Sequence, residues 1–406
     1  QEQPMLRLLQ GDVGAGKTLV AAVAACHALE ADWQVALMAP TEILAEQHYL
    51  NFKRWFEPLG IQVAWLSGKQ KGKARTQAEQ QIKAGHAQLI IGTHALFQDS
   101  IEFSKLGLVI IDEQHRFGVD QRLALRNKGA DQFTPHQLVM TATPIPRTLA
   151  MSAYGDLDTS IIDELPPGRT PIQTVTIPLE RREQVLQRIV SNCTEGKQAY
   201  WVCTLVEQSE TLDAQAAEAT YQEMRERFPE LNIGLVHGKM KADDKQTVMQ
   251  AFKNNQLQLL IATTVIEVGV DVPNASIMVI ENAERLGLSQ LHQLRGRVGR
   301  GATASFCALL YKLPLSQNGQ ERLSILRDSN DGFVIAENDL EIRGPGELLG
   351  TKQTGDMGFR VARLERDSHL LEQAHTVANE LLNNYPQHAD GLLKRWLPKA
   401  PRYAYV

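Results

Sequence analysis

Residues 11–18 have the sequence GDVGAGKT, which fits the pattern G-x-x-x-x-G-K-[ST] of a phosphate-binding loop. The short apolar run Met5–Leu9 precedes this loop, and the amphipathic stretch Leu19–Glu30 follows it. A loop that joins a strand to a helix is the context that the pattern requires, because backbone N–H groups at a helix N-terminus can point toward an anion. The segment therefore predicts a nucleotide-binding domain of the α/β class.

Each fixed position of this loop has a physical role in holding a polyphosphate. Glycines let the backbone approach phosphate oxygens, the lysine reaches the β- and γ-phosphates, and the threonine hydroxyl is a ligand for Mg²⁺. The alternative is a glycine-rich turn before a core helix, and the strand–loop–helix order argues against it. The predicted ligand residues are Gly11, Gly14, Gly16, Lys17 and Thr18.

Short apolar runs alternate with helical stretches on both sides of a proline-rich break at residues 165–171. The runs are apolar at successive positions, which is typical of strands buried on both faces of a parallel sheet. The expected strands are Met5–Leu9, Val35–Met38, Val63–Ser67, Leu89–Gly92, Leu108–Asp112 and Gln137–Thr141 before the break, and Ala199–Cys203, Ile233–Val236, Leu257–Ala262, Ile277–Ile280 and Phe306–Leu310 after it.

This alternation predicts an α/β fold with two parallel-sheet domains in tandem, at residues 1–165 and 166–330. The amphipathic stretches Leu19–Glu30 and Thr41–Glu57 are expected helices of the first domain. Residues 331–406 lose the alternation and predict a small, mainly helical segment, with a helix from Leu364 to Asn384.

Composition narrows the class of protein. Of 406 residues, 43% are hydrophobic and 22% are charged, with a formal net charge of −5, which is typical of a soluble globular protein with more than one domain. Because the chain is slightly acidic as a whole, any contacts with nucleic-acid phosphates are expected to be few and local. The four cysteines show no C-x-x-C spacing and predict reduced thiols. All apolar runs are shorter than the about 20 residues of a membrane span, so a cytoplasmic protein is expected.

An apolar run ends in two carboxylates, Asp112 and Glu113. The carboxyl ends of strands in an open parallel sheet form the ligand crevice, so this pair is expected beside the phosphate loop. Asp112 is the predicted second ligand of Mg²⁺, and Glu113 is the predicted residue that polarises the attacking water. On its own, a strand that ends in Asp-Glu usually leads into a solvated loop.

Residues 290–300 have the sequence QLHQLRGRVGR and contain three arginines in six residues. Repulsion between these cations costs free energy, which a bound anion would offset. Arg297 and Arg300 are therefore predicted to reach across to the γ-phosphate as arginine fingers. Gln293, which begins the pattern Q-x-x-G-R-x-G-R, is a further catalytic candidate. The alternative is a basic turn that contacts solvent or nucleic-acid phosphate.

In this order, the three motifs resemble those of the superfamily 2 helicases and translocases, which are built from two RecA-like domains. The resemblance covers roughly residues 1–300 and implies ATP hydrolysis with Mg²⁺. It also assigns Gly269 and Asp271 to nucleotide sensing. The residues that it assigns to the nucleic-acid track or to coupling are Pro40, Thr41, Gly92, Thr93, His115, Thr141, Thr143, His237, Thr263 and Thr264.

The tail resembles the TRG segment shared by the RecG and Mfd families of DNA translocases. Residues 339–355 contain the runs GPGELLG and TKQTG, which are more similar to the RecG family. The resemblance implies that this segment packs on the second domain and transmits domain closure to the duplex, with Arg343 and Gln353 as its functional residues. The alternative for Arg343 is a surface ion pair with Glu341 or Glu347.

The resemblance implies an ATP-dependent translocase or helicase that remodels branched DNA, such as stalled replication forks and Holliday junctions, in recombination and repair. The implied partners are duplex and branched DNA, with a single-stranded-DNA-binding protein as a further candidate. A monomer in the bacterial cytosol is expected, because one chain carries both halves of the cleft. The family's adenine-reading segment and N-terminal wedge lie before the phosphate loop, so this chain is expected to be a fragment.

Four other functions stay open at this level. An Mfd-type translocase would need a module that binds RNA polymerase, and an RNA helicase of the same superfamily would lack the TRG-like tail. A nucleotide-gated binding module would close on ATP without hydrolysing it, which the presence of Lys17, Glu113 and Arg300 argues against. A small-molecule kinase with a phosphate loop would not need the second domain.

Overall fold

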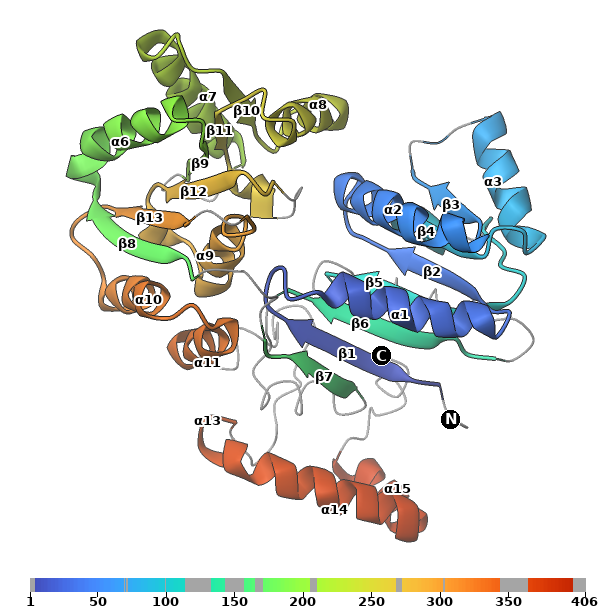
Figure 1. Ribbon diagram of the computed structural model, residues 1–406. Coiled ribbons are helices and arrows are strands. Elements are labelled where there is room, and N and C mark those ends of the chain that lie inside the picture. Colours follow the sequence, from blue (N-terminus) through green and yellow to red (C-terminus); the bar gives the residue numbers. More distant parts are fainter. Residues whose placement is uncertain are drawn as a thin grey trace.

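The computed structural model describes residues 4–68, 70, 72–98, 100–113, 133–142, 157–164, 171–204, 210–267, 272–301, 304–343 and 364–396. These residues form two parallel sheets, each covered by helices, followed by a group of C-terminal helices (Figure 1). The predicted fold class, with two α/β domains in tandem and a helical tail, is confirmed.

The first sheet has seven strands in the order β3-β4-β2-β5-β6-β1-β7. Leu9 of β1 and Asp112 of β5 both pair with Met140 of β6, so the phosphate loop and the acidic pair leave the sheet at the same edge. The strands are β1 (Leu6–Gly11), β2 (Gln34–Met38), β3 (Val63–Leu66), β4 (Leu89–Gly92), β5 (Leu106–Asp112), β6 (His136–Thr141) and β7 (Asp158–Ile162).

Helices cover both faces of this sheet because its central strands are apolar at consecutive positions. In β2, Leu37 packs in the cluster formed with α1 and α2, whereas its neighbour Met38 packs in the cluster on the other face, with Ile82 of α3 and Leu96 of η2. The helices of this domain are α1 (Lys17–Glu30), α2 (Glu42–Phe56), η1 (Glu57–Leu59), α3 (Lys73–Lys83) and η2 (His94–Phe97).

The second sheet has six strands in the order β10-β11-β9-β12-β13-β8, and all of their pairings are parallel. Its strands are β8 (Gln173–Pro178), β9 (Gln198–Val202), β10 (Ile233–Val236), β11 (Leu259–Ala262), β12 (Ala275–Ile280) and β13 (Phe306–Tyr311). Its helices are η4 (Leu179–Arg181), α6 (Arg182–Thr194), α7 (Glu210–Arg227), α8 (Ala242–Lys253), η5 (Thr264–Glu267), η6 (Ala283–Arg285), α9 (Leu288–Arg295) and α10 (Gln317–Asp328).

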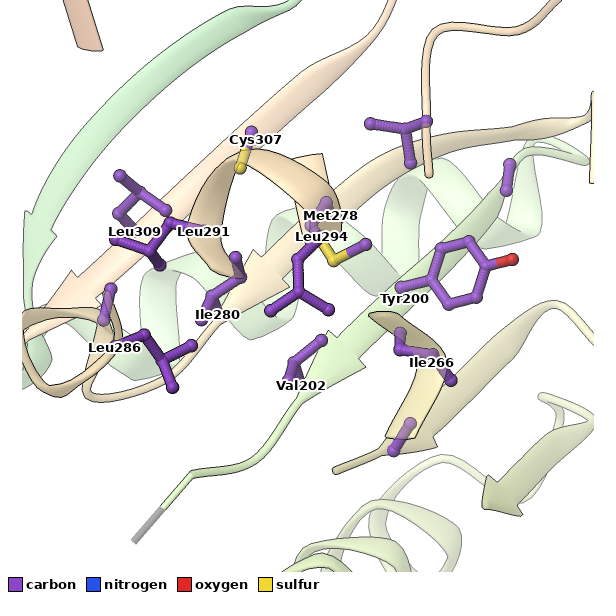
Figure 2. Packing of buried hydrophobic residues seen from close by; sticks show 14 of the residues in the cluster. Tyr200, Val202, Ile266, Met278, Ile280, Leu286, Leu291, Leu294, Cys307 and Leu309 are labelled. Carbon is purple, nitrogen blue, oxygen red and sulfur yellow. The ribbon is translucent and has the colours of Figure 1, made fainter. Parts of the chain in front are cut away.

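The short helix α9 is held on the second sheet by its leucines. Leu291 and Leu294 are fully buried in one cluster with Met278 and Ile280 of β12 and Leu309 of β13 (Figure 2). Burial of one such side chain contributes about 1.5–3 kcal/mol. This packing fixes the helix that leads directly into the arginine-rich segment.

The edge strands β7 and β8, and the helices α11 (Gly332–Arg343) and α15 (Pro386–Trp396), are among the elements that were not predicted individually from the sequence. Strand β7 is mostly exposed, and β8 has only one fully buried position, so neither shows a continuous apolar run. Helix α11 buries Ile335 and Asp339. Because one of its buried residues is an aspartate, the sequence of this helix does not show a regular apolar face. The tail continues with α13 (Leu364–Asp367), η7 (Ser368–Leu370), α14 (Leu371–Asn384) and the unexpected α15 (Pro386–Trp396).

Among the helices of the described segments, none combines the length and the apolar character needed to cross a lipid bilayer.

Candidate nucleotide site between the two domains

The phosphate loop turns tightly between β1 and α1. Gly14 and Gly16 have φ angles of 80° and 97°, a left-handed region that favours glycine. The buried Lys17 ammonium donates hydrogen bonds to the carbonyl oxygens of Gly11 (2.7 Å) and Asp12 (2.9 Å). Burial lowers the pKa of Lys17, although the carboxylates of the acidic pair oppose this shift. Thr18 lies beside Lys17 in the first turn of α1, half-buried.

The acidic pair is buried at the end of β5. Asp112 Oδ1 accepts a hydrogen bond from the Glu113 backbone N–H (3.0 Å), and Asp112 Oδ2 lies 2.7 Å from Nε2 of His48 on α2. Burial alone would raise the pKa of Asp112, but the interaction with His48 and the charge of Lys17 outweigh it and lower that pKa. Asp112 is therefore ionised and can bind a cation.

Glu113 has the environment of a proton acceptor that works near neutral pH. Its φ angle is 53°, which turns the chain sharply after the strand. Burial and the charge of Asp112 raise the pKa of Glu113 to about 7, while Lys17 and Arg297 oppose this rise. Its Oε2 accepts a long hydrogen bond from the N–H of Ala142 at the end of β6 (3.5 Å). Ala142 lies between the predicted coupling residues Thr141 and Thr143, so the acidic pair contacts that segment.

The second domain brings its arginine-rich segment to this site. The positive charge of Arg297 lowers the pKa of Glu113, and that of Arg300 lowers the pKa of Lys17, so both guanidinium groups act on the phosphate-loop site. Arg300 Nε also donates to the carbonyl oxygen of Gly296 (3.2 Å). Gln293 is buried in α9. The structure thus brings the predicted fingers and the predicted loop together.

Direct contacts join the two domains around the loop. Nε2 of His292 in α9 lies 2.6 Å from Oδ1 of Asp12. A Cβ atom added at Gly296 would lie 2.8 Å from Cβ of Val13, so only glycine permits this approach of the two backbones. Further away, Gln246 of α8 donates to Glu46 of α2.

The donor set fits Mg²⁺ bound to a polyphosphate. Mg²⁺ prefers hard oxygen ligands and usually takes only one or two carboxylates from the protein, with phosphate and water completing its shell. The ionised Asp112 and the Thr18 hydroxyl are such ligands. Among the described residues, no group of three or more His, Cys, Asp and Glu side chains is placed to hold a metal ion.

The residues predicted to contact the track in the first domain have structural partners as well. Thr41 is the N-cap of α2, and its hydroxyl accepts from the Leu44 N–H (3.3 Å). Pro40 is half-buried beside it. Gly92 ends β4 where an added Cβ would lie 2.1 Å from the carbonyl oxygen of Leu66, and Thr93 is buried next to it. Close strand packing therefore already explains Gly92.

In the second domain, His237 is buried and its Nε2 lies 3.2 Å from Oε1 of Glu218. Thr263 is buried at the end of β11, and Thr264 is half-buried at the start of η5. Arg343 is the last residue of α11. The other predicted residues lie outside the described part of the chain: His115, Thr143, Gly269, Asp271 and Gln353.

Sequence reasoning missed three residues that the site uses. His48 contacts Asp112 from a position 64 residues away, and no local pattern marks it, although it lies on the same helix that begins at the predicted Thr41. Asp12 and His292 were quoted within their motifs without a role. The only indication in the sequence was that each of these two residues is polar and stands at a variable position of its motif.

Three family models match successive regions of the chain. Residues 4–152 match the DEAD/DEAH box helicase family, residues 181–302 match the helicase conserved C-terminal domain, and residues 329–393 match the C-terminal part of domain 3 of ATP-dependent DNA helicase RecG. The third match coincides with the region that resembles the TRG segment.

Curated relatives match over nearly the whole chain. ATP-dependent DNA helicase RecG of Escherichia coli O157:H7 is 66% identical over 403 residues, which is 99% of this chain and 58% of that protein. RecG of Haemophilus influenzae is 64% identical over 406 residues, which is 100% of this chain and 59% of that protein. The chain therefore spans less than two thirds of the length of these relatives.

A solved structure of RecG bound to a three-way DNA junction has a TM-score of 0.74 and 44% identity, and covers 92% of this chain and 48% of that chain. A single-substitution variant of S. cerevisiae Dbp5 bound to RNA and ADP BeF3 has a TM-score of 0.59 at 16% identity, with 84% of each chain covered, which shows the shared fold alone. Because its two domains and its tail each match, in order and along nearly the whole chain, the chain belongs to the RecG family of superfamily 2 helicases.

Proposed function

We propose that this chain is the motor of an ATP-dependent DNA helicase that remodels branched DNA, such as stalled forks and Holliday junctions, in recombination and repair. The observation that carries the proposal is the meeting of the phosphate loop, the acidic pair and the arginine segment across two domains. RecG relatives are ATP-dependent DNA helicases, and one RecG binds a three-way DNA junction. The tail's match to the RecG domain favours this family over the Mfd-type alternative.

ATP is the proposed substrate of the site between the domains. Loop N–H groups and Lys17 bind its phosphates, and Lys17 exchanges its two carbonyl partners for phosphate oxygens. Glu113 accepts a hydrogen bond from the attacking water, which its pKa of about 7 permits at neutral pH. Arg297 and Arg300 stabilise the charge that develops on the γ-phosphate. Thr18 and Asp112 would hold Mg²⁺, which as a Lewis acid would neutralise part of that charge.

Hydrolysis would be converted into movement along DNA through the contacts between the domains. Closure on ATP and reopening after product release change the spacing between phosphate-binding residues of the two domains, such as Thr41 and Thr264. Contacts with the DNA backbone position the protein without reading sequence, which suits a motor that moves over any sequence. The net charge of −5 is compatible with a few local and reversible contacts.

Further parts of the proposal concern the setting of the motor. We propose a monomer that acts in the bacterial cytosol, with a single-stranded-DNA-binding protein as a partner besides duplex and branched DNA. The proposed division into domains at 1–165, 166–330 and 331–406 is compatible with the three matched regions.

The test is the steady-state ATPase rate of the chain with no nucleic acid, with forked duplex DNA and with RNA. We expect Mg²⁺-dependent ATP hydrolysis that forked DNA stimulates more strongly than RNA, and a Lys17→Ala variant that lacks it. A rate that DNA leaves unchanged would contradict the motor proposal, and preferential stimulation by RNA would favour an RNA helicase. ATP binding without phosphate release would indicate a nucleotide-gated binding module.

A further inference from the structure

A series of hydrogen-bonded side chains runs from the phosphate loop, through two residues of α9, to the carbonyl oxygens at the end of α10. Its interdomain contact is between Nε2 of His292 and Oδ1 of Asp12, at 2.6 Å. The side chains are 5% and 19% exposed, so solvent screens this contact little. His292 belongs to the second domain and Asp12 to the first, 280 residues apart in the sequence.

The direction of these hydrogen bonds follows from Arg295. Its guanidinium can only donate, and its Nη2 lies 3.1 Å from Nδ1 of His292, so Nδ1 is an acceptor. The ring therefore carries its hydrogen on Nε2 and donates it to Asp12. Arg295 is 2% exposed and also donates to the carbonyl oxygens of Leu326 (2.8 Å) and Ser329 (2.7 Å).

Both ends of the series are anchored. Asp12 Oδ1 also accepts from the Val13 N–H (2.7 Å), and the Asp12 carbonyl accepts from Lys17 Nζ (2.9 Å). At the other end, Leu326 and Ser329 lie at the end of α10, just before α11 begins. Ser289 of α9 also donates to Asp339 of α11 (2.7 Å).

We propose that His292 and Arg295 are positioning residues that dock the arginine-rich segment on the phosphate loop and link the α10–α11 connection to the nucleotide site. Of the three arginines in the segment, Arg295 is held by protein carbonyls and by His292, so it serves this docking and leaves the phosphates to Arg297 and Arg300. The inference rests on the proposed ATPase function and adds a route by which the helices after α10 can sense nucleotide.

The test uses variants at both ends of the interdomain contact. His292→Ala and Asp12→Ala should each lower kcat of the DNA-stimulated ATPase about tenfold, the size of one hydrogen bond to a charged group, and change the KM for ATP less than twofold. The double variant should be no worse than the poorer single variant. Asp12→Asn keeps the acceptor and His292→Gln keeps a donor, so both should retain most of kcat. His27→Ala is the matched control, because His27 is 79% exposed on α1.

Additive effects of the two alanine variants, or an Asp12→Asn variant as slow as Asp12→Ala, would overturn the inference. If His292→Ala fails to fold, the Asp12 pair of variants still decides it, because these substitutions lie in a half-buried loop. Small-angle X-ray scattering with a non-hydrolysable ATP analogue separates this inference from the proposed function. Suppose that the wild-type chain compacts when it binds the analogue but does not hydrolyse ATP, and that Asp12→Ala does not compact. This result would contradict the proposed ATPase activity and still support the docking contact.

Discussion

At the residue scale, Glu113 combines three properties that few surface carboxylates share. It is buried, its backbone is left-handed, and its pKa is raised to about 7 by burial and by the charge of Asp112. A carboxylate with these properties is poised to accept a proton near neutral pH, which suits a residue that orients water.

Glu113→Gln should therefore lower kcat for ATP hydrolysis by about 100-fold or more while ATP binding is retained, since general-base groups contribute about 10²–10⁴-fold. The measurement is phosphate release with forked DNA, alongside equilibrium binding of a fluorescent ATP analogue. Glu102→Gln is the matched control, because Glu102 forms an exposed ion pair with Lys83. A Glu113→Gln variant with normal turnover would remove Glu113 from its proposed role.

The thiols offer a second test at this scale. Burial raises the pKa of Cys193 and of Cys307 to about 12, and it also raises the pKa of the buried Cys203. Burial and the charge of Glu30 raise the pKa of Cys26 as well, but this side chain is only partly buried and a reagent can reach it. At pH 8 a thiol with a pKa of 12 is ionised in about one molecule in ten thousand, and the thiolate is the reactive form. One thiol should react quickly with a disulfide reagent at pH 8, and all four should react in denaturant. Cys26→Ser should abolish the fast phase, and rapid labelling of more thiols would show that the core is open.

At the element scale, the close approach of α9 to the phosphate loop depends on Gly296. Its φ angle of −64° is one that any residue adopts, so its need for glycine comes from Val13 on the other domain. Glycine is therefore required at this position by a contact between the domains, and not by a local turn.

Gly296→Ala should consequently lower the DNA-stimulated ATPase, by about tenfold or more, without lowering the thermal midpoint. Alanine suits this backbone conformation, and by reducing the conformational entropy of the unfolded chain it stabilises the folded state by about 0.4–1 kcal/mol. The free energy of unfolding should therefore stay the same or increase. Calorimetry and ATPase rates on the same samples make the comparison. Gly391→Ala in α15, where an added Cβ meets open space, is the matched control. Unchanged turnover in Gly296→Ala would show that the domains work without this approach.

How well each element could be predicted depended on where its contacts lie. Interior strands such as β2 and β9 were predicted nearly to the residue, because burial on both faces writes a continuous apolar run. Edge strands β7 and β8 are exposed and were missed. Likewise, the loop and the acidic pair are local motifs, whereas His48–Asp112 and His292–Asp12 join residues 64 and 280 apart. Such pairs depend on packing that no short pattern encodes.

At the scale of the whole molecule, the proposed nucleotide site takes residues from both domains, so a bound nucleotide should stabilise the two domains together. Any ligand that binds only the folded chain stabilises it by about 2.7 kcal/mol at a hundredfold excess over its Kd. For domains of this size, that corresponds to a rise of about 5–10 °C in the midpoint, at 2–4 °C per kcal/mol.

Thermal unfolding with Mg²⁺ and a non-hydrolysable ATP analogue should show this rise, with the transitions of the two domains moving together. Lys17→Ala should remove the rise, since its ammonium is the buried cation of the loop. The analogue without Mg²⁺ should give a smaller shift. A rise confined to one of two separate transitions would indicate that nucleotide binds the first domain alone.

The pairing of β7 with β1 has a mechanical consequence. Among the described residues, β7 is the last strand of the first sheet along the chain, and it lies parallel to β1 over five residue pairs, ending with Ile162 beside Gly11. Tension carried along the polypeptide between the domains would therefore act along the axis of β7, which is hydrogen-bonded to β1, the strand that ends at the first residue of the phosphate loop. Parallel strands pulled lengthwise share the load across all of their hydrogen bonds at once, so this edge can bear force without peeling open.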